Sequence, residues 1–273
     1  MTIREWMQGA LKGAPHASRL ETELVAAERL GMNRANLLAH LDDEVSDSVM
    51  AQLEKDAQSL ANHRPIQYIL GRAFFRDCEY EVNENVLIPR FDTEHLVEAV
   101  LARVRSSQAE VLDLCTGSGI VAISFARERA AWRVHASDLS PKALEVARLN
   151  GERLGAKVEW REGDLLAPWE GMRFDCISAN PPYIEGNEYL ELAEEIHKEP
   201  IMALVAEEEG LLFYKRLATE SKAYLNSGGW LAVEIGYNQG EAVTALFSKN
   251  DFKEVECLKD DQGHDRVVVG HLL

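Results

Sequence analysis

The chain has 273 residues, of which 46% are hydrophobic and 27% are charged, so it is long enough to bury a core in one large domain or two smaller ones. Its formal net charge of −17 argues against tight binding to a nucleic-acid backbone and fits a basic protein partner. The four cysteines form no Cys-x-x-Cys pair, so we expect reduced thiols and no metal site. The N-terminus lacks the apolar region of a signal peptide, and no apolar run reaches the length of a membrane span. We therefore expect a cytoplasmic protein with no membrane contact.

Residues 1–71 carry helical patterns and predict a small helical bundle. Ser18 and Glu21 form a capping-box pattern that begins one helix, and Gly31 is placed to end it. Asn33 is placed to cap the next helix. Because the polar faces of these helices carry no cluster of catalytic groups, we expect this domain to recognise a substrate and to perform no chemistry.

The pattern then changes to strands and helices that alternate. Residues 72–86 contain two short strand patterns and predict a β-hairpin linker. In residues 87–273 we expect strands at 110–114, 133–137, 158–161, 174–179, 229–235, 252–257 and 266–272, and helices at 120–130, 141–154, 211–225 and 241–248. This alternation predicts an α/β fold, a Rossmann-like and mostly parallel sheet with helices on both faces.

A glycine-rich turn is expected where the first strand of this sheet ends. It reads Asp-Leu-Cys-Thr-Gly-Ser-Gly over residues 113–119, and Gly117 and Gly119 would let the backbone approach a ligand closely. Asp138 ends the second strand, where a carboxylate can accept hydrogen bonds from both hydroxyls of a ribose. This pattern by itself would also fit an enzyme that binds a nicotinamide dinucleotide.

The acidic residues at the strand ends favour a cationic cofactor that has no phosphate. Asp113 would repel a pyrophosphate but attract an ammonium or a sulfonium group. Asp164 ends the third strand, where it could meet the amino group of an adenine. S-adenosylmethionine offers all of these groups, so the sequence predicts it as the cofactor. Each acid taken alone could instead be a helix cap.

The fourth strand ends at Asn180-Pro181-Pro182-Tyr183, which predicts a polar clamp for a planar nitrogen group. The lone pair of an amide nitrogen is delocalised, so this nitrogen is a poor nucleophile that needs orientation. Asn180 and the carbonyl of Pro181 could each accept one N–H, while Tyr183 packs on the flat group. Orientation of this kind can lower a barrier by ~7–11 kcal/mol at best. A rigid turn without function is the alternative for this segment.

Together these motifs resemble the release-factor glutamine methyltransferases, which modify the glutamine of the Gly-Gly-Gln loop in bacterial class-1 peptide-chain release factors. The resemblance covers essentially the whole chain and is carried by residues 68–71, 88–94, 113–119, 180–183, 199–204, 234–236 and 265–266. The Asn-Pro-Pro-Tyr signature is shared with adenine-N6 DNA methyltransferases. The segment Pro89-Arg90-Phe91-Asp92-Thr93-Glu94 and the helical N-terminus are more specific to the glutamine enzymes.

The resemblance implies a class I methyltransferase sheet with an antiparallel last strand, S-adenosylmethionine as methyl donor and release factors as protein substrates. The residues that would hold the cofactor are Cys115, Thr116, Gly117, Ser118, Gly119, Asp138, Asp164, Leu165 and Asn180. Those that would hold the glutamine amide are Leu87, Asn180, Pro181, Pro182 and Tyr183. The family often has glycine in place of Cys115 and proline in place of Phe91. Because Cys115 carries a side chain, we expect its backbone to avoid positive φ.

Two alternatives remain at this point. An adenine-N6 nucleic-acid methyltransferase would need a basic groove, and the net charge and the acidic run over residues 185–199 speak against one. A non-catalytic protein that keeps the fold would have no use for the intact residues Gly117, Gly119, Asp138 and Asn180.

Overall fold

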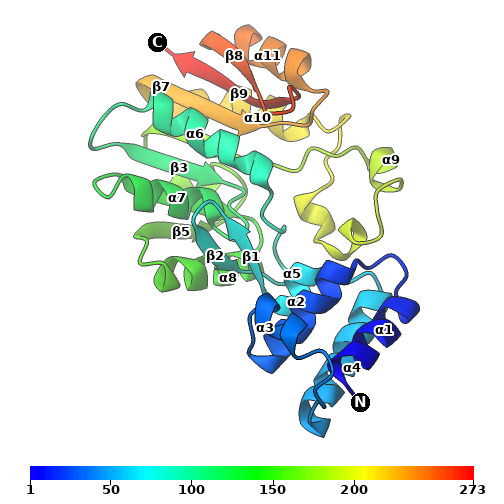
Figure 1. The fold of residues 1–273 in the computed structure, drawn as a ribbon. Helices are drawn as coiled ribbons and strands as arrows, with labels where there is room; N and C mark the ends of the chain where they lie inside the picture. Colours follow the sequence, from blue (N-terminus) through cyan, green and yellow to red (C-terminus); the bar gives the residue numbers. More distant parts are fainter. The chain divides into compact units, whose positions relative to one another are not determined.

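The computed structural model describes residues 1–273, which divide into two compact units (Figure 1). The helical unit comprises Met1–Arg72 together with Ala193–Lys198, and the sheet unit comprises Ala73–Leu192 together with Glu199–Leu273. No helix of the chain combines the length and the apolar character that a membrane crossing requires.

The helical unit contains five helices around an apolar core. They are α1 (Ile3–Gly13), α2 (Arg19–Leu30), α3 (Arg34–Ala39), α4 (Asp47–Ala61) and α5 (Ile66–Leu70). Ser18 begins α2 with the predicted capping box, and Asn33 caps α3. Arg29 of α2 donates to Asp56 of α4 at 2.7 Å and to the carbonyl of Ile69 in α5 at 2.9 Å. This pairing ties three helices together at a carboxylate that is only 4% exposed.

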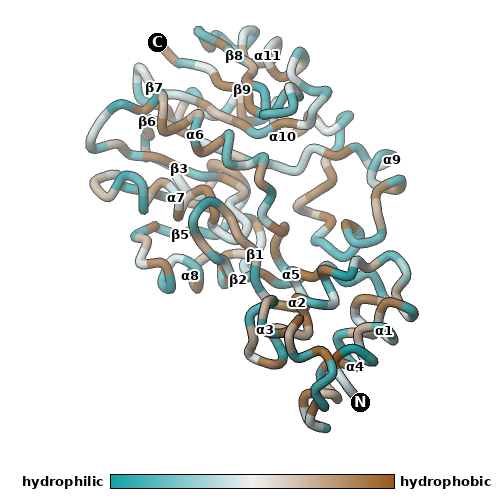
Figure 2. The backbone as a smooth tube through the Cα atoms, viewed as in Figure 1, coloured by the Kyte–Doolittle hydropathy of each residue, from teal (hydrophilic) through white to brown (hydrophobic).

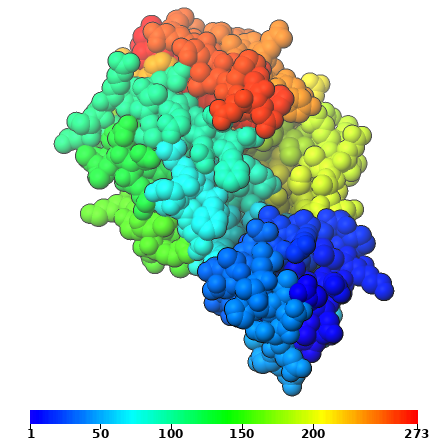
Figure 3. All heavy atoms as spheres, viewed as in Figure 1, coloured from blue at the N-terminus to red at the C-terminus, as the bar shows by residue number.

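The sheet unit begins with a hairpin that packs on helices. β1 (Arg72–Phe75) and β2 (Cys78–Glu81) pair in a two-stranded sheet. Arg76 in its turn forms ion pairs with Glu98 of α6 (Glu94–Arg103) and with Glu128 of α7 (Ile120–Glu128). In Figure 3 the cyan surface of the hairpin accordingly borders the turquoise surface of α6.

The main sheet has seven strands in the order β5-β4-β3-β6-β7-β9-β8. They are β3 (Glu110–Leu114), β4 (Arg133–Asp138), β5 (Val158–Glu162), β6 (Phe174–Ala179), β7 (Leu225–Glu234), β8 (Lys253–Lys259) and β9 (Asp265–Leu272). The first five run parallel, whereas β9 lies antiparallel to both β7 and β8, which confirms the predicted sheet with its antiparallel last strand. The strand order reverses between β3 and β6, and ligands of such sheets bind outside the carboxyl ends at this reversal.

Alternation along the strands explains why helices cover both faces. Val111 of β3 belongs to a core that includes α6 and α7, while its neighbour Leu112 belongs to a core that includes α10 (Leu212–Glu220) and α11 (Gly240–Lys249). Successive side chains of a strand point to opposite faces, so a strand that is buried on both sides is apolar throughout. In Figure 2 brown, hydrophobic backbone accordingly runs along β3 and α7. The remaining helices of this unit are α8 (Pro141–Arg153) and the short α9 (Gly186–Tyr189).

Two predicted boundaries were wrong near the end of the chain. The helix expected at residues 211–225 ends earlier, as α10 followed by a 3₁₀ turn at Ser221–Ala223. The strand expected from residue 229 already begins at Leu225, which pairs with Phe174 of β6 across an irregular register. The Asn-Ser-Gly-Gly sequence after Leu225 is typical of a turn, and pairing with β6 overrides that local preference.

Candidate active site

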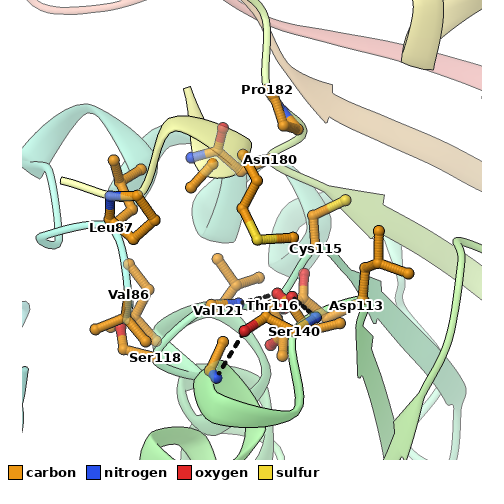
Figure 4. A pocket seen from close by; sticks show the side chains of 18 of the residues that line it. Val86, Leu87, Asp113, Cys115, Thr116, Ser118, Val121, Ser140, Asn180 and Pro182 are labelled. Atoms are coloured by element: carbon orange, nitrogen blue, oxygen red, sulfur yellow. Dashed lines mark hydrogen bonds between the residues drawn. The ribbon is translucent and has the colours of Figure 1, made fainter. Parts of the chain in front are cut away.

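A cavity of about 1010 Å³, open mouth included, lies at the carboxyl ends of β3, β4 and β6 (Figure 4). Its wall contains eleven of the residues predicted from the sequence, namely Leu87, Asp113, Cys115, Thr116, Gly117, Ser118, Asp138, Asp164, Leu165, Asn180 and Pro182. The structure does not place Gly119, Pro181 or Tyr183 in this wall. Figure 4 shows Asn180 and Pro182 on one side of the cavity and Thr116 and Ser140 on the other.

The two glycines of the turn have different roles. Gly117 has φ of 54°, and a Cβ there would meet no atom within 4 Å, so this backbone faces open space in the cavity. Gly119 has φ of 85°, and a Cβ there would come within 3.0 Å of Trp160 and 3.1 Å of Ile123. Gly119 therefore allows α7 to pack closely on its neighbours, while Gly117 leaves room for a ligand.

The expectation for the backbone of Cys115 was wrong. Cys115 has φ of 55°, in the left-handed region that it was expected to avoid. It follows directly after β3, where the chain must leave the strand and turn into the glycine loop. The geometry of this loop overrides the cost of about 1–2 kcal/mol that a side chain pays in the left-handed region.

Asp113 is a buried carboxyl group at the end of β3, with 1% of its surface exposed. It accepts hydrogen bonds from the hydroxyl of Thr116 at 2.6 Å and from that of Ser178 at 2.8 Å. Burial raises the pKa of Asp113 to about 7, although these two hydroxyl groups act in the opposite direction. A cation in the cavity would favour the ionised form, so this carboxyl group suits the ammonium or sulfonium of S-adenosylmethionine.

Asp138 at the end of β4 shapes the glycine turn. One of its oxygens accepts from the backbone N–H of Gly117 at 2.8 Å, and the other accepts from that of Ser140 at 2.9 Å. Burial raises the pKa of Asp138, and these backbone hydrogen bonds oppose the shift. Each oxygen keeps a further lone pair, so the carboxylate can hold the turn and still accept from a ribose.

We predict that Asp138→Ala weakens the binding of S-adenosylmethionine by roughly 1–3 kcal/mol. The substitution leaves the ribose hydroxyls without a hydrogen-bond acceptor and removes the carboxylate that holds the glycine turn. Asp138→Asn keeps one acceptor oxygen and serves as the matched control, with an intermediate loss. Titration calorimetry measures both affinities. An unchanged affinity of the alanine variant would mean that the ribose is held by other groups.

The predicted contact for the adenine is half exposed. Asp164 is 51% exposed and pairs with Arg216 of α10 at 2.9 Å. An ion pair at such an exposed site is weak, so the carboxylate can exchange this partner for an adenine amino group. Beside it the wall contains Leu139 and Phe213, two apolar side chains that the sequence did not single out and that can cover the faces of a flat base.

The clamp residue Asn180 lies directly after β6. Its amide nitrogen donates to the hydroxyl of Thr93 at 3.3 Å, and Thr93 is only 1% exposed. With its donor end directed to Thr93, the amide leaves its oxygen as the group that can accept from a ligand in the cavity. Thr93 belongs to the segment at residues 89–94 that carries the family resemblance, and no role in the site was predicted for it.

Tyr183, the last residue of the Asn-Pro-Pro-Tyr segment, supports the wall from behind. The carbonyl of Tyr183 accepts from the side chain of Gln239 at 3.1 Å, and its N–H donates to the carbonyl of Leu204 at 3.2 Å. Burial raises the pKa of Tyr183, so its phenol stays neutral. These contacts hold the segment in place without exposing Tyr183 to the cavity.

A second buried acid fixes another part of the wall. Glu199, 6% exposed, forms an ion pair with Arg90 and accepts from the backbone N–H of Ile88 at 2.9 Å. This contact joins the segment before α6 to the segment that contains Pro200, and both line the cavity. The spacing of 111 residues between Ile88 and Glu199 leaves no local signal for it in the sequence.

Comparisons with known proteins agree with this geometry. The Methyltransferase small domain family matches residues 91–214, and the PrmC N-terminal domain family matches residues 2–71. The chain is 38% identical to the release factor glutamine methyltransferase of Geobacter sulfurreducens, over 99% of this chain and 95% of that protein. It is 40% identical to the one of Neisseria gonorrhoeae, over 99% of this chain and 97% of that protein.

Among solved structures, a methyltransferase from Pyrococcus furiosus shares the fold. It has a TM-score of 0.56 and 19% identity, and the match covers 80% of this chain and 98% of that one. The strand order, the glycine turn beside strand-end acids and the full-length relatives all point to one family and to S-adenosylmethionine as the cofactor. The chain therefore belongs to the release factor glutamine methyltransferases, a family of S-adenosylmethionine-dependent enzymes.

Proposed function

We propose that this protein transfers a methyl group from S-adenosyl-L-methionine to the side-chain amide nitrogen of the glutamine in the Gly-Gly-Gln loop of class-1 peptide-chain release factors. The observation that carries the proposal is the orientation of Asn180, whose donor end is held by Thr93 at the wall of the cofactor cavity. Its oxygen is then available to an N–H of a substrate amide. The activity belongs in the cytoplasm, where translation ends.

The residues of the chain contribute mainly orientation. When bound, S-adenosylmethionine supplies an electrophilic methyl group, and cleavage of its sulfur–methyl bond leaves S-adenosyl-L-homocysteine as the product. Asn180 and the carbonyl of Pro181 would accept the two N–H groups of the glutamine, and Leu87 and Pro182 would border the amide. Fixing both hydrogens aims the nitrogen at the methyl carbon, and such alignment accounts for up to ~7–11 kcal/mol of barrier lowering. The nitrogen becomes acidic as the bond forms, so its proton can leave to water without a strong base.

The cofactor fits the groups that line the cavity. Asp113 suits a cation, Asp138 suits a ribose, and Gly117 leaves space where any side chain would intrude. Thr116, Ser118 and Leu165 would complete its contacts along the same wall. We assign the ammonium end of the cofactor to Asp113, because an uncompensated buried carboxylate gains most from a cation.

The direct test is mass spectrometry of the loop peptide after the protein, the cofactor and a release factor have reacted. A gain of one methyl group on the glutamine is expected. A parallel reaction with DNA and labelled cofactor examines the adenine alternative that the shared Asn-Pro-Pro-Tyr segment raises. Label in DNA and none in the release factor would overturn the proposal, whereas the net charge of −17 predicts the reverse.

We further propose that residues 1–71 recognise the release factor. Removing them is expected to leave the affinity for S-adenosylmethionine largely intact, because every residue that lines the cavity lies beyond residue 84. Turnover on the whole release factor should fall strongly, while turnover on a short loop peptide should change little. Steady-state kinetics on both substrates measure this difference. A truncated enzyme that methylates the whole release factor at the normal rate would contradict the recognition role.

A further inference from the structure

A buried glutamate stands at the end of β7, behind the clamp. Glu234 is 2% exposed and is the last residue of its strand. Its Oε2 atom is buried and has no hydrogen-bond partner. A buried polar atom without a partner destabilises a protein, so an apolar residue would serve packing better at this position.

The neighbours of Glu234 connect it to the clamp residue. Asn180 and Glu234 directly follow Ala179 and Val233, which are paired across β6 and β7, so the two residues are neighbours at the strand ends. Hydrogen bonding from the side chains of Thr93 and Asn180 lowers the pKa of Glu234 against the effect of its burial. Asn180 also donates to Thr93 at 3.3 Å. An ionised carboxylate can only accept hydrogen bonds. The hydroxyl of Thr93 must therefore donate to Glu234 and accept from Asn180.

This arrangement leaves one orientation for the amide of Asn180. Its amide nitrogen donates to Thr93. The neighbouring carboxylate of Glu234 favours the same nitrogen end, so the oxygen of the amide is directed away from both. A flipped amide would bring its oxygen against the carboxylate and leave the Thr93 oxygen without a donor. Both changes are unfavourable because the side chains of Thr93 and Glu234 are buried.

We propose that Glu234 is a positioning residue, which holds the amide of Asn180, through direct and Thr93-mediated hydrogen bonds, with its oxygen directed at the substrate nitrogen. The proposal rests on the proposed function, because it concerns the hydrogen bond that Asn180 would accept from the amide of the substrate glutamine. Glu234 itself touches neither substrate nor cofactor, since it is absent from the cavity wall.

The charge of Glu234 decides whether it can perform this task. Burial raises the pKa of Glu234 to about 7, while hydrogen bonds from Thr93 and the charge of Arg266 oppose the shift and the charge of Asp92 adds to it. The other facing groups are Tyr183, which stays neutral, and the hydroxyl of Tyr214 in α10, which donates to the backbone oxygen of Glu234 at 2.9 Å.

Arg266 of β9 offers only partial compensation. It pairs with Asp260 at 2.9 Å and with Asp92 at 3.2 Å, so its charge is shared among three acids. Below the pKa of Glu234 the carboxyl group carries a proton and becomes a donor, and the single orientation of Asn180 is lost. Single-turnover rates are therefore expected to rise with pH through about 7 and to level above it.

The test compares Glu234→Gln with the wild-type enzyme at saturating cofactor, over pH 6–9, on the substrate that the wild type methylates. Glutamine keeps the shape but cannot titrate, and it can hydrogen-bond the amide of Asn180 in either orientation. We expect kcat to fall about tenfold at high pH, the scale of losing one hydrogen bond to a charged group, with a flat profile through pH 7 and an unchanged affinity for S-adenosylmethionine. The control Glu256→Gln, on exposed β8, should leave the profile unchanged.

A second pair of variants tests the same proposal if Glu234→Gln does not fold. Thr93→Val removes the bridging hydroxyl and should reproduce the loss in kcat, whereas Thr93→Ser keeps the hydroxyl and should recover most of it. Wild-type kcat and pH dependence in Glu234→Gln, or in Thr93→Val where the first variant does not fold, would overturn the positioning role. A wild-type enzyme that methylates no glutamine would instead refute the proposed function itself.

Discussion

Replacing Asn180 by alanine is expected to lower the single-turnover rate at least ~10²-fold, the scale for losing one positioned contact to the transition state. The side chain lies at the cavity wall with its donor end directed to Thr93, so alanine removes the only oxygen that this side chain offers to the substrate. The cofactor affinity should fall far less than the rate. Rapid-quench measurements at saturating cofactor give the rate, and calorimetry gives the affinity.

Two further substitutions at the same position separate hydrogen-bond acceptance from mere shape. Asn180→Asp keeps an acceptor but places a second carboxyl group beside Glu234, so one of the two must hold a proton. It should retain more activity than alanine at a cost in stability. Asn180→Gln displaces the oxygen by about one bond length and should resemble alanine, because near-attack geometry tolerates such shifts poorly. An alanine variant with near-normal rates would reduce the Asn-Pro-Pro-Tyr segment to a structural turn.

The second large effect is expected from Gly210→Ala, at a residue outside the cavity wall. Gly210 has φ of 76°, and a Cβ there would lie 2.1 Å from the carbonyl oxygen of Tyr183 and 2.7 Å from the side-chain nitrogen of Gln239. These two atoms form the hydrogen bond that holds the Asn-Pro-Pro-Tyr segment from behind. We expect a loss of about 2–4 kcal/mol in the free energy of unfolding, from overpacking and from the left-handed backbone together.

Gly171→Ala is the matched control for the backbone contribution. Gly171 has φ of 81°, but a Cβ there would meet no atom within 4 Å. It should lose only about 1–2 kcal/mol. Urea unfolding monitored by circular dichroism measures both variants, and the turnover of folded Gly210→Ala should also fall because Tyr183 is displaced. Equal losses in the free energy of unfolding for the two variants would contradict this prediction, because they would show that the added Cβ at Gly210 causes no overpacking against Tyr183.

Much of the fold could be predicted because its signals are local. The expected bounds of β3 and β6 agree with the structure residue for residue, since both are short apolar runs between polar breaks. The capping box at Ser18 needs only four consecutive residues. The strand-end acids Asp113 and Asp138 could be paired in advance because parallel strands bring their carboxyl ends to one edge of the sheet.

The sequence by itself thus determined the sheet, the family and eleven residues of the cavity wall, because periodicity and short motifs are readable over a few residues. Only the tertiary structure decided which side chains control the clamp. Thr93 and Asn180 are 87 residues apart, and Glu234 comes from a third segment. No local sequence pattern therefore predicts that these three side chains interact. The left-handed backbone of Cys115 was decided in the same way, because the path of the whole loop outweighs the preference of one residue.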